Sequence, residues 1–154
     1  MSCVTTAQVH HEGGYALDTR YILLVGKGNS FKLLKGDNAL SISILLHYKI
    51  IQHPTVAGTY KIKTSAYYYT INDANGKELL AYHWHPTETP DIPYPHLHIG
   101  DPKLKKFHLP TGRVSLEQVL RLLIRDFKVK PKKANWEAIL NETQDLFETY
   151  RSWH

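Results

Sequence analysis

The stretch Thr59–His85, TYKIKTSAYYYTINDANGKELLAYHWH, decides the fold of this chain. Thr59–Ile71 begins with apolar or aromatic residues alternating with lysines, and this period of two is typical of a β-strand. Asn72–Gly76 ends in an Asn-Gly pair, which tolerates the positive φ angles of a hairpin turn. Glu78–His85 is then the return strand, so the stretch predicts an antiparallel β-hairpin.

Three further segments extend this hairpin into a sheet. Ser41–Ile51 is rich in Ile, Leu and Tyr and is predicted as a partly buried strand. Tyr21–Val25 is short and apolar, which indicates a strand or a short helix. Pro95–Gly100 is predicted as another strand, because proline is tolerated at the first position. Short loops join these segments, so we expect an antiparallel sheet of about four or five strands, with residues 1–17 as a loose arm.

The chain changes character at Ser115, where Ser-Leu-Glu-Gln forms a capping box. A helix of ~12 residues follows, because apolar residues recur at helical spacing: Leu116, Val119, Leu120, Leu123, Ile124 and Phe127. Arg121 and Arg125 are expected on its outer face, and a second helix is predicted after Asn135. The chain is therefore expected to be one α+β domain, residues 1–154, with two C-terminal helices packed on the sheet.

The composition limits the class of partner. The 154 residues carry a formal net charge of +5, which favours anionic partners and nucleic acid above all. The single cysteine, Cys3, excludes an intrachain disulfide and a cysteine-based zinc cluster. No apolar run reaches the ~18 residues of a membrane span, and the N-terminus lacks the pattern of a secretory signal. We therefore expect a cytoplasmic protein with no membrane partner.

Histidines are concentrated in Ala81–Leu109, AYHWHPTETPDIPYPHLHIGDPKLKKFHL. This stretch holds five of the ten histidines of the chain: His83, His85, His96, His98 and His108. Four of them form two His-x-His pairs, and residues i and i+2 of a strand point to the same face. If the two strands are neighbours, up to four imidazoles converge, so the sequence predicts a histidine site.

The leading hypothesis is metal-independent cleavage of RNA, an endoribonuclease activity that needs no cofactor. One imidazole would take the proton of the 2′-OH and another would protonate the leaving oxygen. His96 and His98 are the expected acid and base, with His83 and His85 as further catalytic candidates. The candidates for binding the substrate are cations, one further imidazole and a ring that stacks on unpaired bases: Lys103, Lys105, Lys106, Arg113, His108 and Trp84.

Two alternatives stay open at this point. Three or four imidazoles would suit Zn²⁺, Ni²⁺ or Cu²⁺, so the pairs also indicate a histidine metal site. Their spacing is similar to the first half of a cupin signature, although Glu88 falls one residue too early and the later half is missing. The third hypothesis is a non-catalytic module that binds nucleic acid or a partner protein through a basic, aromatic sheet.

The segment Pro95–Asp101, PHLHIGD, followed by Leu-Glu-Gln-Val-Leu at residues 116–120, resembles the TumE-type toxins of bacterial toxin–antitoxin pairs. The resemblance covers about residues 79–124 and carries over to His96 and His98 alone. Ala81–His85 replaces the Arg-x-Asp type of element that precedes the histidine pair in that family, and the C-terminal helix is an extension. The resemblance implies a small prokaryotic toxin that acts on RNA or translation and is held by a cognate antitoxin protein. A homodimer is left open.

Overall fold

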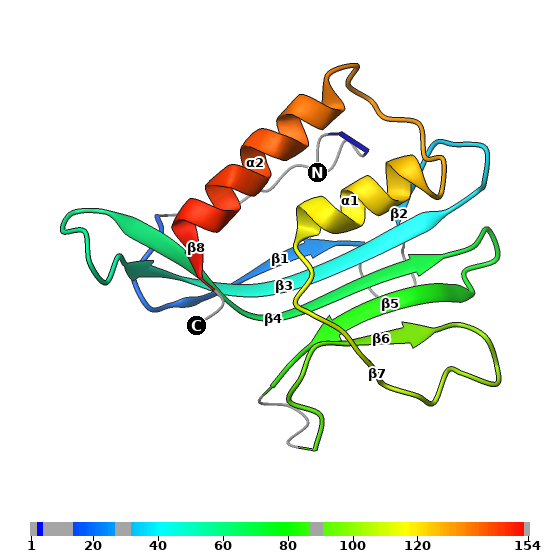
Figure 1. Ribbon diagram of the computed structural model, residues 1–154, viewed down its shortest axis with the longest axis horizontal. Coiled ribbons are helices and arrows are strands. Elements are labelled where there is room, and N and C mark those ends of the chain that lie inside the picture. Colours follow the sequence, from blue (N-terminus) through cyan, green and yellow to red (C-terminus); the bar gives the residue numbers. More distant parts are fainter. Residues whose placement is uncertain (1–2, 5–13, 27–31, 87–90, 153–154) are drawn as a thin grey trace.

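The computed structural model describes residues 3–4, 14–26, 32–86 and 91–152, and its architecture is a sheet with two helices on one face (Figure 1). The main sheet order is β1-β3-β4-β5-β6-β7, and every neighbouring pair is antiparallel. The bounds are β1 Arg20–Val25, β3 Ser41–Gln52, β4 Tyr60–Asn72, β5 Glu78–Trp84, β6 His96–Ile99 and β7 Leu109–Pro110. Two short strands, β2 (Lys32–Leu33) and β8 (Arg151–Ser152), pair with β3 and β4. The α+β class is confirmed, with more strands than predicted.

The predicted hairpin is formed by β4 and β5. Gly76 adopts a φ of 78°, the left-handed conformation that the Asn-Gly pair indicated. The carboxylate of Asp73 accepts hydrogen bonds from the backbone N–H groups of Asn75 and Lys77, at 2.8 and 2.9 Å. These bonds tie the turn to its own backbone, so they set the register in which β5 returns along β4.

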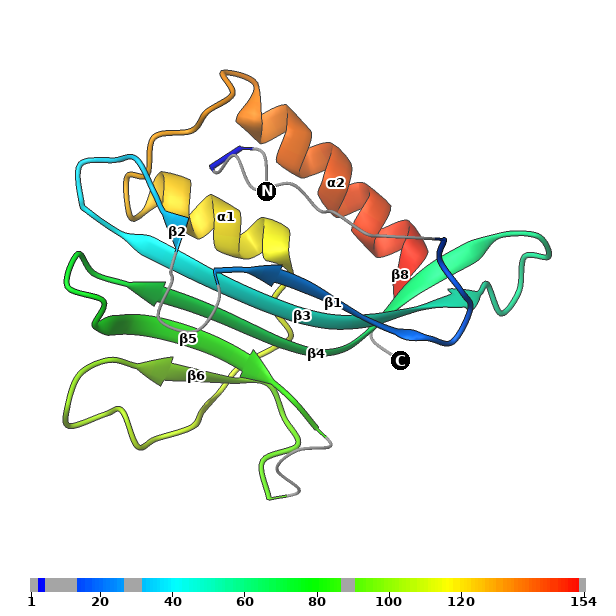
Figure 2. The ribbon, with the colours of Figure 1, turned by 180° about the vertical axis from the view of Figure 1, so that it is seen from behind.

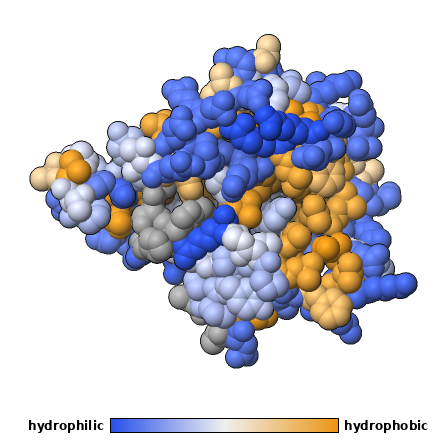
Figure 3. Space-filling view, in the orientation of Figure 1, coloured by the Kyte–Doolittle hydropathy of each residue, from blue (hydrophilic) through white to orange (hydrophobic). Residues whose placement is uncertain are grey.

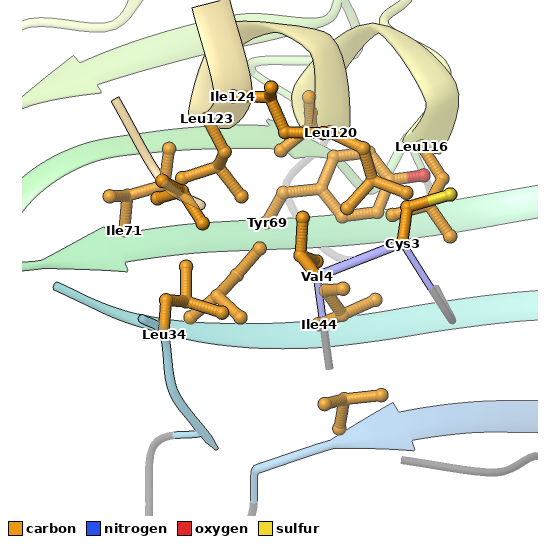
Figure 4. Packing of buried hydrophobic residues seen from close by; sticks show 14 of the residues in the cluster. Cys3, Val4, Leu34, Ile44, Tyr69, Ile71, Leu116, Leu120, Leu123 and Ile124 are labelled. Atoms are coloured by element: carbon orange, nitrogen blue, oxygen red, sulfur yellow. The ribbon is translucent and has the colours of Figure 1, made fainter. Parts of the chain in front are cut away.

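The core lies between α1 (Leu116–Arg125) and alternate residues of the central strands (Figure 4). Ser115 and Gln118 form the predicted capping box, which starts α1 directly at Leu116. Side chains of β3 and β4 pack against this helix: Ile42, Ile44, Tyr67, Tyr69 and Ile71. Burial of such apolar surface is the main favourable term in folding. We call this side of the sheet the helix face.

The second helix, α2 (Trp136–Tyr150), begins directly after Asn135 as predicted and packs beside α1 (Figures 1 and 2). The Arg121 guanidinium donates to the Asn141 side chain at 2.6 Å, and Arg125 forms an ion pair with Glu137. The two arginines expected on the outer face of α1 therefore bind α2. Their interactions orient the helices, although exposed pairs contribute little to stability.

The start of the chain differs from the loose arm predicted for residues 1–17. Cys3 and Val4 are buried in the core beside α1, and the carbonyl of Cys3 accepts a hydrogen bond from the Lys132 backbone N–H at 2.7 Å (Figure 4). The arm prediction also covers residues 5–13, which lie outside the described part of the chain. Two apolar residues within a polar segment are a weak signal, and only packing shows their place.

The surface in the view of Figure 3 is mostly hydrophilic along the helices and hydrophobic below them on one side. No helix among the described residues has the length and apolar character needed to cross a membrane.

The side of the sheet opposite the helices carries the residues that alternate with the core positions. Tyr68 of β4 pairs with His83 of β5, and His83 pairs with His96 of β6, so all three share one side. We call that side the histidine face.

Candidate functional site: a five-histidine cluster

Strand register brings the two predicted histidine pairs together. His83 lies directly opposite His96, and His98 lies opposite Ala81, whose small side chain leaves room beside it. Directly opposed residues of antiparallel strands hold their side chains on the same face. The alternation predicted from the His-x-His spacing is confirmed, since His96 and His98 lie on the histidine face and Leu97 pairs with Tyr82 on the other side.

The five imidazoles form one contiguous cluster. His96 is central, with ring centroids 5.6 Å from His83, 5.2 Å from His85, 5.0 Å from His98 and 4.8 Å from His108. Rings around His96 also contact one another, with centroid distances of 6.0 Å for His83–His85, 4.8 Å for His83–His98 and 4.6 Å for His98–His108. The fifth ring, His108, comes from the segment that joins β6 to β7. Three strand histidines (His83, His96 and His98) and two histidines outside the strands (His85 and His108) therefore share a single site.

His96 is the most informative member, because it is fully buried. Its Nδ1 lies 3.0 Å from the backbone carbonyl oxygen of Tyr94. A carbonyl oxygen only accepts, so Nδ1 carries the proton and Nε2 of the neutral ring holds the lone pair. That Nε2 is buried without a hydrogen-bond partner among the described residues. An unsatisfied buried polar atom costs about 1–3 kcal/mol, so the fold keeps this nitrogen at a price in stability.

Burial keeps three rings of the cluster, His83, His96 and His108, uncharged at neutral pH. Desolvation, followed by repulsion from the other imidazoles, lowers the pKa of His83 to about 3. Desolvation also lowers the pKa of His96, although the Tyr94 carbonyl opposes that effect. The pKa of His108 is lowered by the same cause and by His98 and His85. These three rings therefore present neutral nitrogens at pH 7.

Two features hold the rings in place. Tyr68 stacks parallel on His85, with ring centroids 5.1 Å apart and an interplanar angle of 2°. Gly100 directly follows β6 and lies so close to β5 that an added Cβ would lie 1.6 Å from the carbonyl oxygen of Glu78. No residue but glycine allows this approach, which brings His98 against His83.

Sequence reasoning missed two groups of the site. One is Tyr68, whose position opposite His83 depends on strand register, and the other is the backbone carbonyl of Tyr94.

The cluster contains two sets of three imidazoles whose ligand atoms all lie within 4.8 Å of one another. We call His83, His85 and His96 the inner set, and His96, His98 and His108 the outer set. Both sets consist of histidines alone, and both include His96. A divalent transition metal needs ligand atoms that converge in this way, so either set could hold one.

Two predicted site residues lie away from the cluster. Trp84 alternates with His83 and His85, so it faces the helix side, where it is 5% exposed. The Arg113 guanidinium stacks over its ring at 3.8 Å from the centroid, and desolvation lowers the pKa of Arg113. The structure therefore does not bring the predicted base-stacking ring or the predicted phosphate contact to the histidine face. Their contact with a substrate stays a prediction.

The predicted lysines lie on the turn that leads to His108. Lys103, Lys105 and Lys106 are all exposed, and the turn is stabilised by Asp101, whose carboxylate accepts from the Lys103 backbone N–H at 2.8 Å. Glu88 of the cupin-like spacing lies outside the described residues. The basic turn is thus continuous along the chain with the outer set.

The resemblance around PHLHIGD is short, so a match to a family or to a fold would be needed to establish it. None of the protein-family models, curated proteins or solved structures compared with this chain matches it. The TumE-type resemblance stays a prediction, and the function has to be argued from the histidine cluster itself.

Proposed function

We propose that this protein binds one divalent transition-metal ion, such as Zn²⁺, Ni²⁺ or Cu²⁺, through its histidine cluster. One observation carries the proposal: the buried Nε2 of His96 lacks a hydrogen-bond partner among the described residues and lies amid four other imidazoles. In a neutral imidazole one ring nitrogen is an acceptor, and no donor among the described residues reaches that nitrogen of His96. A metal ion accepts several lone pairs at once, which removes that cost.

The surroundings of His96 suit a ligand. Metal-binding histidines commonly donate their second ring N–H to a carbonyl or carboxylate, which fixes the tautomer, and Tyr94 supplies such a carbonyl. The purely imidazole character of both sets favours Zn²⁺, Ni²⁺ or Cu²⁺ over Mg²⁺ and Ca²⁺, which prefer oxygen ligands. The sequence-based hypothesis of a metal site is thereby preferred over metal-independent catalysis.

Three protein ligands would leave a coordination position open to another molecule. An ion held in that way supplies Lewis acidity and can activate a water molecule. The chain's own residues would orient the ligands, through Tyr94 and Tyr68, and exclude water from the inner side of the cluster. This arrangement is compatible with catalysis and does not specify a substrate.

Metal titration of the untagged, metal-free protein tests the proposal. We expect one equivalent of Zn²⁺ to bind with a dissociation constant in the micromolar range or tighter, measured by calorimetry, and elemental analysis to find the ion after dialysis. His96→Ala should weaken binding at least ~100-fold, because it removes the ligand common to both sets. The matched control is His53→Ala, in the β3–β4 turn, which should bind normally. Equal binding by the wild type and His96→Ala would contradict the proposal.

Metal-independent RNA cleavage is the second candidate. It is favoured by the half-buried pair His98 and His108, 4.6 Å apart and next to the exposed lysines of the turn. On this hypothesis, cleavage of single-stranded RNA persists in EDTA, has a bell-shaped dependence on pH and is abolished by His98→Ala. Cleavage that requires added metal would instead assign the activity to the metal centre.

A toxin role and a cognate antitoxin rest on the family resemblance and are tested by growth. Expression of the wild type in bacteria should slow growth, whereas expression of the His96→Ala and His98→Ala variants should not. RNA is isolated from the same cultures, so that slowed growth can be compared with RNA cleavage. Equal growth of all three strains, with intact RNA in each, would reject a toxic ribonuclease.

A further inference from the structure

We infer that an ion bound by the outer set takes a phosphate oxyanion as its exchangeable ligand, preferably from a phosphate ester that carries a planar ring. This inference rests on the proposed metal site and names the class of molecule that the site binds. It follows from the single free nitrogen of His96, the unequal exposure of the two sets, and the charge of the neighbouring turn.

The two sets cannot be complete at the same time. They share His96, whose Nδ1 is 3.0 Å from the Tyr94 carbonyl, so Nε2 is its one available ligand atom. A lone pair coordinates one ion. The cluster is therefore one metal centre with two alternative positions rather than a binuclear site with both triads filled.

The two positions differ in access. The inner set contains two buried rings, His85 and His96, and the parallel Tyr68 ring covers His85. The outer set replaces His83 and His85 by two half-buried rings, His98 and His108, of which the second lies on a loop. An ion at the outer position is thus the one that an external ligand reaches. The inner position would hold the ion with less exchange.

The charge around the outer position selects an anion. All three ligands are neutral imidazoles, so the ligands leave the charge of a divalent ion uncompensated. Residues 101–107, DPKLKKF, add three lysines against one aspartate, and that carboxylate binds its own turn. Lys106 is two residues from His108, so its Cα lies within about 7 Å of that of His108 by chain length alone. Phosphate oxygens are suited both to the metal and to lysine ammonium groups.

Two exposed rings adjoin the outer set, Phe107 in the sequence and Tyr94 in space, and indicate the rest of the ligand. Phe107 immediately precedes His108 and is 55% exposed, and Tyr94, 39% exposed, has its ring centroid 6.2 Å from that of His96. Exposed aromatic rings of this kind stack on planar groups. A phosphate ester with an aryl or base group therefore fits better than inorganic phosphate.

The experiment uses the full chain loaded with Co²⁺, whose visible spectrum reports a change in its ligands. Inorganic phosphate, phenyl phosphate and adenosine monophosphate are titrated separately. We expect each to change the spectrum, with the two ring-bearing esters binding several-fold more tightly than inorganic phosphate. Replacing all three lysines by serine should weaken phosphate binding roughly ten-fold, which corresponds to about 1.4 kcal/mol.

Matched ligand variants separate the two positions. His108→Ala leaves the inner set complete, so cobalt should stay bound and the response to phosphate should be lost. His85→Ala leaves the outer set complete, so the response should persist, and His98→Gln is a second outer variant in case His108→Ala misfolds. Cobalt binding with no response to any phosphate, or an equal response in wild type and both outer variants, would overturn the inference. Failure of the wild type to bind cobalt would contradict the metal centre itself.

Discussion

The two faces of the sheet differ in the side chains that they carry: the helix face is apolar, and the histidine face holds a cluster of imidazoles. On the helix face, Tyr67 and Tyr69 stack at 4.8 Å and are sealed under α1. On the histidine face, Tyr68, the residue between them, stacks on His85 instead. One run of three tyrosines thus supplies both the core and the candidate site. Strand alternation divides their roles, and a shift of one residue in register would exchange them.

The residues of the two faces contribute differently to the stability of the fold and to the candidate site. The helix face is closed by apolar contacts, so its residues contribute chiefly to folding. The histidine face buries polar rings, including one nitrogen without a described partner, at a cost to folding. Proteins retain a buried polar group that costs stability chiefly where function needs it. The buried histidines are therefore consistent with a ligand-binding role. The following predictions test this division, from the largest expected effect to the smallest.

Gly100→Ala should have the largest effect, because it forces β5 and β6 apart. The new Cβ would lie 1.6 Å from the Glu78 carbonyl oxygen. We expect a loss of more than about 3 kcal/mol in the free energy of unfolding, measured by urea denaturation, together with loss of metal binding. Gly112→Ala is the control, because a Cβ there meets nothing within 4 Å. Similar stabilities for the two variants would show that the strands adjust without cost.

Leu123→Ala tests the helix face alone. Leu123 is fully buried, so its truncation should cost about 2–5 kcal/mol in the free energy of unfolding. Leu24, on the histidine face of β1 and 45% exposed, is the matched position, and Leu24→Ala should cost less than about 1 kcal/mol. Both folded variants should bind Zn²⁺ as the wild type does. Weaker binding by Leu123→Ala in its folded state would show that the two faces are coupled.

Acid should destabilise the metal-free protein through the histidine face. The pKa of His83 is about 3 in the folded protein, whereas an unfolded histidine titrates near ~6.5. The unfolded chain therefore binds more protons between these values, so stability is complete above pH ~6.5 and is lost as the pH falls towards 3. Denaturation at several pH values should show this loss, and His83→Gln should reduce it. An unchanged pH profile for His83→Gln would assign the loss to other groups.

Arg113→Ala should have the smallest effect. Arg113 stacks on Trp84 on the helix face, so its removal should cost about 1 kcal/mol of stability through the lost cation–π contact. Affinity for Zn²⁺ and for phosphate should not change. A marked loss of phosphate affinity would return Arg113 to the binding role that the sequence suggested. Lys106→Ala, made in the same background, provides the comparison from the basic turn.

Local sequence patterns determined much of the secondary structure of this protein and one part of its candidate site. Alternation and the Asn-Gly pair predicted the β4–β5 hairpin, and the Ser115–Gln118 capping box predicted the start of α1. The His-x-His spacing predicted that His96 and His98 share a face. Each of these features depends on residues within a few positions of one another, and backbone geometry makes that relation readable from the chain alone.

Tertiary structure decided the relations between distant segments. Strand register set His83 opposite His96. The path of the backbone between β6 and β7 brought His108 into contact with both His96 and His98. The same alternation that gathers the histidines sends Trp84 to the helix face, where Arg113 joins it. Cys3 and Val4 enter the core although their neighbours are polar. Such relations depend on pairing and packing across long sequence separations, for which a local pattern carries no information.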